Sequence, residues 1–207
     1  MENEAAEILR EALRRLRESY GERYMTQYFT ERDIVRELQA HLIQIANDEK
    51  KPLIVIHNYP VERDGKRALL VDLAIISEEN KDEKGGLDIA IEFKYEPDHE
   101  RMIKRPFSKQ GILYSKLPVV QRGDVAKDIR RIEDFVNGKD SISGADLLPN
   151  IENAYAILID EGGYHYRYNR KGFEDLGGEW KEWSEKGKVF IVKKSKPHSY
   201  APDIFSG

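Results

Sequence analysis

Three charged side chains, Asp72, Glu92 and Lys94, lie in two sequence runs that otherwise have the apolar pattern of β-strands. Side chains two residues apart on a strand point to the same side, so Glu92 and Lys94 share one face of the run from 87 to 96. Asp72 is the lone charge in the run from 68 to 76. Because burying an unpaired carboxylate is costly, we expect a cation or hydrogen-bond donors near Asp72.

If the two runs form neighbouring strands, these three side chains can converge. The carboxylates of Asp72 and Glu92, with the backbone carbonyl of Phe93, offer hard oxygen ligands that suit Mg²⁺ or Mn²⁺. Lys94 could orient or help deprotonate an attacking water and neutralise charge that develops at phosphorus. This set suits phosphodiester hydrolysis. The simpler alternatives are a surface ion pair of Glu92 with Lys94, or Asp72 pairing with Lys94 in an unrelated α/β protein.

The elements before these strands follow from periodicity and turn residues. Residues 4 to 18 have a helical stripe of apolar residues, and Gly21 is placed to end that helix. Thr30 can cap a second helix, with Asp33 as its capping-box partner. The pair at 64 and 65, Asp-Gly, predicts a turn between two strands, and the run from 87 to 96 adds a third strand to an antiparallel meander.

The elements after the strands complete the expected order. Residues 124 to 139 predict a third helix with Asp124 as its cap and Gly138 as its stop, and 154 to 160 a short buried strand that is parallel to one of the others. The tail from Gly162 is rich in aromatic residues and glycine, which predicts one or two added strands. We therefore expect one domain with an N-terminal helix (1–21), a core (28–160) and an aromatic-rich β extension (161–207).

The spacing of the charged residues resembles a known signature. VDLAII, followed about twenty residues later by IEFK, resembles the Asp…(Asp/Glu)-x-Lys motif of the PD-(D/E)XK nuclease superfamily, which has the restriction-endonuclease-like fold. The resemblance implies an α-β-β-β-α-β core with a mixed central sheet. It also implies an Mg²⁺-dependent nuclease in which Asp72 and Glu92 bind the metal and Lys94 is the catalytic lysine. Val71 stands where the motif often has proline.

Two further segments resemble parts of the same superfamily. TERDIVREL resembles the first core helix of archaeal Holliday-junction resolvases, which would make Glu31 a third catalytic acid, with Glu37 as the alternative. Gln110 and Tyr114 resemble the Gln-x-x-x-Tyr element of the exonuclease-type branches.

Charge is distributed unevenly along the chain, whose formal net charge is −4. The segment from 101 to 131 holds nine Lys and Arg against two Asp, so it carries +7 and the remainder carries −11. Such a region can bind a polyanion, because phosphate contacts are local; a solvated loop and helix is the alternative. The predicted nucleic-acid-binding residues are Arg101, Lys104, Arg105, Lys109, Gln110, Tyr114, Lys116 and Arg122.

Several classes of function lack support in the sequence. Cysteine is absent, which excludes disulfides and thiolate zinc sites. No run approaches the roughly 20 apolar residues that span a bilayer, and no phosphate-binding Gly-rich loop indicates a nucleotide cofactor. We expect a cytoplasmic protein that has no membrane partner. The N-terminal helix could pack on a second subunit as easily as on its own core, so a homodimer stays open.

The sequence thus predicts a metal-dependent deoxyribonuclease that cuts DNA endonucleolytically. The alternative is a catalytically silent nuclease-fold module that binds nucleic acid or scaffolds a defence, repair or mobile-element complex.

Overall fold

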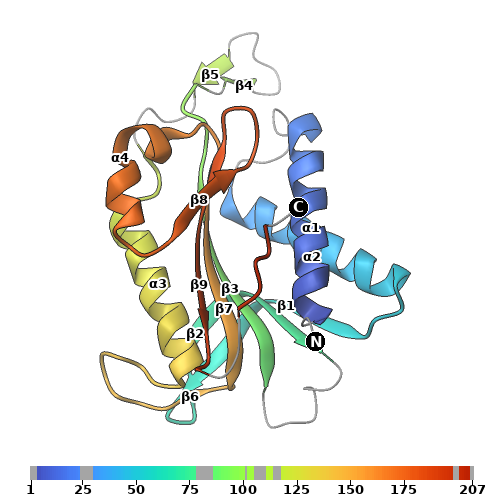
Figure 1. Cartoon of the computed structure of the whole chain (residues 1–207), viewed down its shortest axis with the longest axis vertical. Helices are drawn as coiled ribbons and strands as arrows, with labels where there is room; N and C mark the ends of the chain where they lie inside the picture. The colour runs from blue at the N-terminus through green and yellow to red at the C-terminus, as the bar shows by residue number, and fades with distance from the viewer. Residues whose placement is uncertain are drawn as a thin grey trace.

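A computed structural model of the chain describes residues 4–23, 30–77, 86–100, 102–104, 111–113, 118–197 and 201–205. It shows an α/β protein in which a seven-stranded mixed sheet carries helices on both faces (Figure 1). The elements in chain order are α1 (Glu4–Arg23), α2 (Glu31–Asp48), β1 (Leu53–Arg63), β2 (Lys66–Ser77), β3 (Leu87–Glu96), β4 (Met102–Lys104), β5 (Gly111–Leu113), α3 (Arg122–Asn137), β6 (Leu147–Leu148), β7 (Ile151–Asp160), α4 (Tyr164–Glu174), β8 (Glu179–Glu182) and β9 (Lys188–Ser195).

The strand order across the main sheet is β6-β1-β2-β3-β7-β9-β8. The predicted hairpin and meander are confirmed, because β1 pairs antiparallel with β2 and β2 with β3. The turn uses Asp64 and Gly65, whose φ angles of 50° and 70° are those a two-residue hairpin requires. The predicted parallel strand is also confirmed, since β7 pairs parallel with β3. β4 and β5 form a separate two-stranded sheet.

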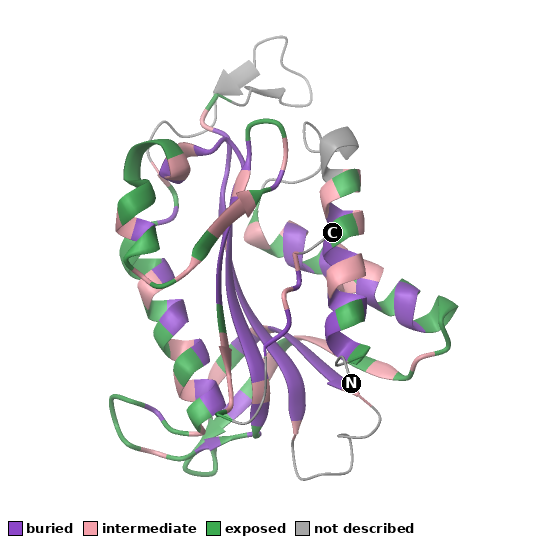
Figure 2. Cartoon of the chain, in the orientation of Figure 1, coloured by how far each residue is buried: buried purple, intermediate pink, exposed green. Residues whose placement is uncertain are grey.

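Two hydrophobic cores lie on opposite faces of the sheet. On one face α1 and α2 pack over large side chains of β2 and β3, such as Leu73, Ile91 and Phe93. On the other face α3 packs over small residues, such as Ala74 and Ala90. Figure 2 shows that the buried residues fill the central strands and the helix sides that face them. Glu92 and Lys94 alternate with Ile91 and Phe93 along β3, so they point to the α3 side.

Two of the helix ends predicted from the sequence are confirmed, and two predictions are wrong. Thr30 caps α2, and its side chain and that of Asp33 form the expected capping box. Gly138 ends α3 with a φ of 66°. The prediction that Asp124 is the cap of α3 is wrong, because Gln121 is the N-cap and Asp124 is its partner three residues on. The predicted stop at Gly21 is also wrong, since α1 continues to Arg23. A helical glycine costs only about 1 kcal/mol, which a well-packed helix can offset.

The C-terminal region differs from the predicted β extension. α4 follows β7 directly, and only then do β8 and β9 add to the sheet. The Asp160 carboxylate accepts hydrogen bonds from the backbone N–H groups of Tyr164 (2.8 Å) and Tyr166 (3.0 Å), which satisfies donors of the first helical turn. The alternating tyrosines therefore belong to a helix whose start is fixed by a strand residue.

None of the described helices is long and apolar enough to cross a membrane.

Candidate functional site

The candidate site lies where β2 and β3 separate. The two strands pair from Ile75 opposite Ile89 to Leu73 opposite Ile91, and their ladder goes no further. One residue beyond, the Asp72 carboxylate takes the place of a strand carbonyl and accepts the Phe93 N–H at 2.8 Å. Asp72 thus has a donor, as expected, and Asp72 and Glu92 lie next to each other where the strands part.

Lys94 connects this opening to both layers of helices. Its ammonium nitrogen lies 2.9 Å from Asp128 Oδ2 on α3 and 3.5 Å from Glu31 Oε2 at the start of α2. It also donates to the Phe93 carbonyl at 2.7 Å. Asp72, Glu92 and Lys94 therefore lie together at the opening between β2 and β3, and Lys94 reaches the first residue of α2.

The position of Glu31 separates it from the alternative acid. Glu31 is the first residue of α2 and reaches Lys94, whereas Glu37 lies further along the helix with its carboxylate 3.7 Å from His41 Nε2. Burial is the main reason that the pKa of Glu31 is raised from 4.5 to about 6, with repulsion from Asp72 and Asp128 adding to it and Lys94 opposing it. Of the two acids, Glu31 is the one that the structure brings to the site.

Glu92 is buried, with a relative exposure of 1%, and faces a guanidinium. Arg131 Nη1 donates to Glu92 Oε2 at 3.1 Å, and Arg131 Nη2 lies 3.0 Å from Glu92 Oε1. Burial nevertheless raises the pKa of Glu92 well above its usual value, and repulsion from Asp72 adds to this effect. The carboxylate is therefore held at an energetic cost that its ion pair does not remove.

Asp128 and Arg131, both on α3, were not selected as site residues from the sequence. Asp128 lies on the inward side of α3, near Val125 and Ile132, and is 4% exposed. A lone acid on an apolar helix stripe is the same signal that singled out Asp72 on its strand, so it could have found Asp128. Arg131, one turn later, was counted as part of a basic surface, but its guanidinium turns inward.

The charge of Lys94 follows from its neighbours. Burial alone would lower the pKa of Lys94, but the carboxylates of Asp128 and Glu31 and the field of Asp72 more than offset burial, so its pKa is raised. The ammonium therefore keeps its proton at neutral pH. In this arrangement Lys94 is suited to neutralising negative charge and not to accepting a proton.

The chemistry of the donor set, four carboxylates close together, is that which a divalent cation prefers. Asp72, Glu92, Asp128 and Glu31 against Lys94 and Arg131 leave a formal charge of −2. Among the described residues, Glu92 Oε1 and Asp128 Oδ2 are buried without a hydrogen bond, although each lies beside a cation. No group of three or more acids or histidines in the described part of the chain is arranged to hold a metal ion. The site therefore has oxygen ligands and negative charge, but the guanidinium of Arg131 contacts both carboxylate oxygens of Glu92.

Most of the predicted nucleic-acid-binding residues lie outside the described residues; these are Arg101, Arg105, Lys109, Gln110, Tyr114 and Lys116. Lys104 is the last residue of β4. Arg122 begins α3 on the exposed surface and donates from Nε to the Gly172 carbonyl at 2.6 Å. The DNA-binding role of this segment stays a prediction.

A second buried polar cluster lies two residues beyond Lys94 on the same face of β3. Glu96 is 0% exposed and accepts the backbone N–H groups of Val119 (3.1 Å) and Val120 (2.7 Å). The ring nitrogens His99 Nε2 and His165 Nε2 lie 2.5 and 3.3 Å from its two oxygens. Both oxygens of Glu96 therefore have partners.

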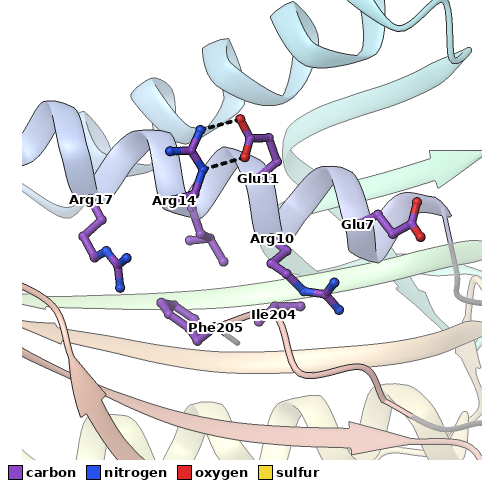
Figure 3. A pocket seen from close by; sticks show the side chains of 8 residues that line it. Glu7, Arg10, Glu11, Arg14, Arg17, Ile204 and Phe205 are labelled. Atoms are coloured by element: carbon purple, nitrogen blue, oxygen red, sulfur yellow. Dashed lines mark hydrogen bonds and ion pairs between the residues drawn. The ribbon is translucent and has the colours of Figure 1, made fainter. Parts of the chain in front are cut away.

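A pocket of about 140 Å³ lies away from these clusters, between α1 and the C-terminal residues (Figure 3). Arg10 and Arg17 point from α1 toward Ile204 and Phe205, whereas Arg14 turns away from them toward Glu11. Arg14 is paired with Glu11, and Arg10 Nε donates to the Asp203 carbonyl at 3.0 Å. None of the predicted catalytic residues lines this pocket.

No family model matches the chain, and no curated protein or solved structure matches it either.

Proposed function

We propose that this protein is a metal-dependent deoxyribonuclease with a restriction-endonuclease-like core. The observation that carries the proposal is the convergence of Asp72, Glu92 and Lys94 where β2 and β3 separate, next to the start of α2. The element order of helix, three antiparallel strands, helix and parallel strand supports it. Local sequence does not require Asp72, Glu92 and Lys94 to meet, so a shared task is the simplest reason for their placement.

The protein groups would divide the hydrolysis of a phosphodiester among them. Asp72, Glu92 and the Phe93 carbonyl would hold Mg²⁺ or Mn²⁺, which when bound polarises a phosphoryl oxygen and lowers the pKa of water. Lys94, which stays charged, would stabilise the negative charge that develops on the phosphate oxygens. Glu31, with a pKa of about 6, can accept a proton from the attacking water near neutral pH.

Cleavage assays with duplex, single-stranded and branched DNA test this proposal. With Mg²⁺ or Mn²⁺ present, the unsubstituted chain should cut at least one form, and EDTA should stop the reaction. Lys94→Ala should lose the activity, while Lys171→Ala, at an exposed lysine on α4 outside the basic segment, should keep it. Equal cleavage by the Lys94→Ala and unsubstituted proteins would contradict the proposed role of Lys94.

One observation favours a second candidate, the catalytically silent module. Arg131 already neutralises Glu92, and the Asp72 carboxylate is used by the Phe93 N–H. A protein whose acids serve only to hold its own backbone and α3 would show this pattern. Such a module should shift DNA in a gel and yet cut none of the three DNA forms with either metal.

A further inference from the structure

The guanidinium of Arg131 sits inside the acidic cluster. It contacts both oxygens of Glu92 and also donates from Nη2 to the Leu70 carbonyl of β2. Its Nε is buried without a hydrogen bond among the described residues. The side chain of Arg131 is 22% exposed, so one edge of it faces solvent. Arg131 thus bridges β2 and β3 on the α3 side of the opening.

This position is one that a divalent ion would need. A metal ion held by Glu92 must approach the same two carboxylate oxygens that Arg131 contacts. Two cations a few ångströms apart in a partly buried site repel each other strongly, because little water screens them. A metal ion and the guanidinium therefore cannot both hold Glu92 favourably.

A second carboxylate, that of Asp128, lies close enough to pair with the Arg131 guanidinium if it moves away from Glu92. Asp128 Oδ1 lies 3.7 Å from Arg131 Nη1, one helical turn before it on α3. The Arg131 side chain is long and reaches solvent, so it can turn away from Glu92. This movement breaks its hydrogen bond to the Leu70 carbonyl, but that bond is exposed, so water can replace the donor. The Glu92 ion pair can open without leaving either charge far from a counter-charge.

We propose that Arg131 is an internal stand-in cation: it holds Glu92 while no divalent ion is bound, and metal binding displaces it from that carboxylate. Arg131 is therefore a positioning residue that sets the metal affinity of the site. This inference rests on the proposed function, because it assumes that Glu92 binds a divalent ion.

Calorimetric titration of the full chain with Mn²⁺ tests the competition. Arg131→Gln removes the charge and should bind Mn²⁺ about tenfold more tightly or better, because the opposing cation is gone. Arg130→Gln is the matched control: it makes the same change of net charge on the exposed neighbouring position of α3 and should leave the affinity unchanged. Equal or weaker Mn²⁺ binding by Arg131→Gln would overturn the inference.

A second variant and a second readout guard against a folding defect. Arg131→Lys keeps the positive charge but presents a single point charge instead of a planar fork, so its Mn²⁺ affinity should fall between the other two. In EDTA, Arg131→Gln should unfold at a lower temperature than the unsubstituted chain, and saturating Mn²⁺ should raise its melting temperature by more. A destabilised Arg131→Gln that gains nothing from Mn²⁺ would show that the arginine is only structural.

The outcomes separate the two proposals. If the unsubstituted chain binds Mn²⁺ and cuts DNA while Arg131→Gln gains no affinity, the inference fails and the proposed function stands. If Arg131→Gln binds Mn²⁺ more tightly but no form of DNA is cut, the inference stands and the nuclease function fails. If neither protein binds Mn²⁺, both fail.

Discussion

Glu92 and Glu96 lie four residues apart on the same face of β3, and both are almost completely buried, yet their surroundings are opposite. Burial opposes the charged form of Glu96, but hydrogen bonds from His165, His99 and the backbone of Val119 and Val120 outweigh burial and lower its pKa. Burial and repulsion from Asp72 raise the pKa of Glu92, and its ion pair does not compensate. Burial alone therefore does not decide whether the pKa of a carboxylate is raised or lowered; the match with its partners does.

The difference assigns separate roles to the two acids. Glu96 binds His99 just after β3 and the backbone at Val119 and Val120 just before α3, so it joins the two ends of the connection between β3 and α3. Its bonds are those of a structural anchor. Glu92 has an oxygen without a hydrogen bond and faces a cation from α3. A folded chain tolerates such a residue at a cost in stability, which is common at sites that bind a ligand.

The largest expected effect is on catalysis and concerns Glu92. Glu92→Gln keeps the shape of the side chain but removes the charge that would hold the metal, so DNA cleavage should fall by about a thousandfold or more, roughly 4 kcal/mol in the activation barrier. Cleavage rates under single-turnover conditions measure this loss. A Glu92→Gln protein that cuts DNA at the original rate would remove Glu92 from the proposed site.

The next effect is on stability and concerns Glu96. Glu96→Ala leaves two backbone N–H groups, of which that of Val120 is buried, and two histidines without their acceptor, which should cost about 3 to 5 kcal/mol in the free energy of unfolding. Urea denaturation, followed by circular dichroism, measures the loss. Glu92→Gln serves as the comparison. If Glu96→Ala lowers the free energy of unfolding by no more than Glu92→Gln does, Glu96 is not the structural residue of the two.

A smaller effect appears in how stability depends on pH. A carboxyl whose pKa is raised in the folded state binds its proton more tightly there than in the unfolded chain. The stability of the folded protein therefore falls as the pH rises from the ordinary value of 4.5 through the raised pKa of Glu92. Glu92→Gln should lack this decline. Thermal unfolding of both proteins across this pH range checks the sign; parallel curves would show that Glu92 is not under strain.

The smallest effect comes from Glu11, a partly exposed carboxylate that gives a comparison for the buried ion pair of Glu92 with Arg131. Hydrogen bonds from Arg14 and then Arg15 lower the pKa of Glu11 on α1 to about 2. The stability that Glu11 contributes is present above pH 4.5 and is lost as the pH falls toward 2. Since solvent screens the pair, Glu11→Gln should cost only about 0.5 kcal/mol at neutral pH. A loss above 2 kcal/mol, measured by urea unfolding, would show that exposure is a poor guide to the worth of these ion pairs.

Features encoded within a few residues could be predicted from the sequence. The faces of β2 and β3, the cap at Thr30 and the turn at Asp64 each depend on strand alternation, a side chain three residues away or a positive φ angle. The faces of the two strands were enough to select Asp72, Glu92 and Lys94 as a group. Local rules failed for α4, because its start is stabilised by Asp160, a residue of the preceding strand.

What the sequence by itself determined is the identity of the charged residues and the strand face that each occupies, since alternation along a strand is a local property. Only the tertiary structure decided which charges meet: that β2 and β3 separate beside Asp72, that Glu31 and not Glu37 reaches Lys94, and that α3 brings Arg131 to Glu92. These contacts join residues far apart in the chain. Their formation depends on the packing of whole layers, which no short spacing encodes.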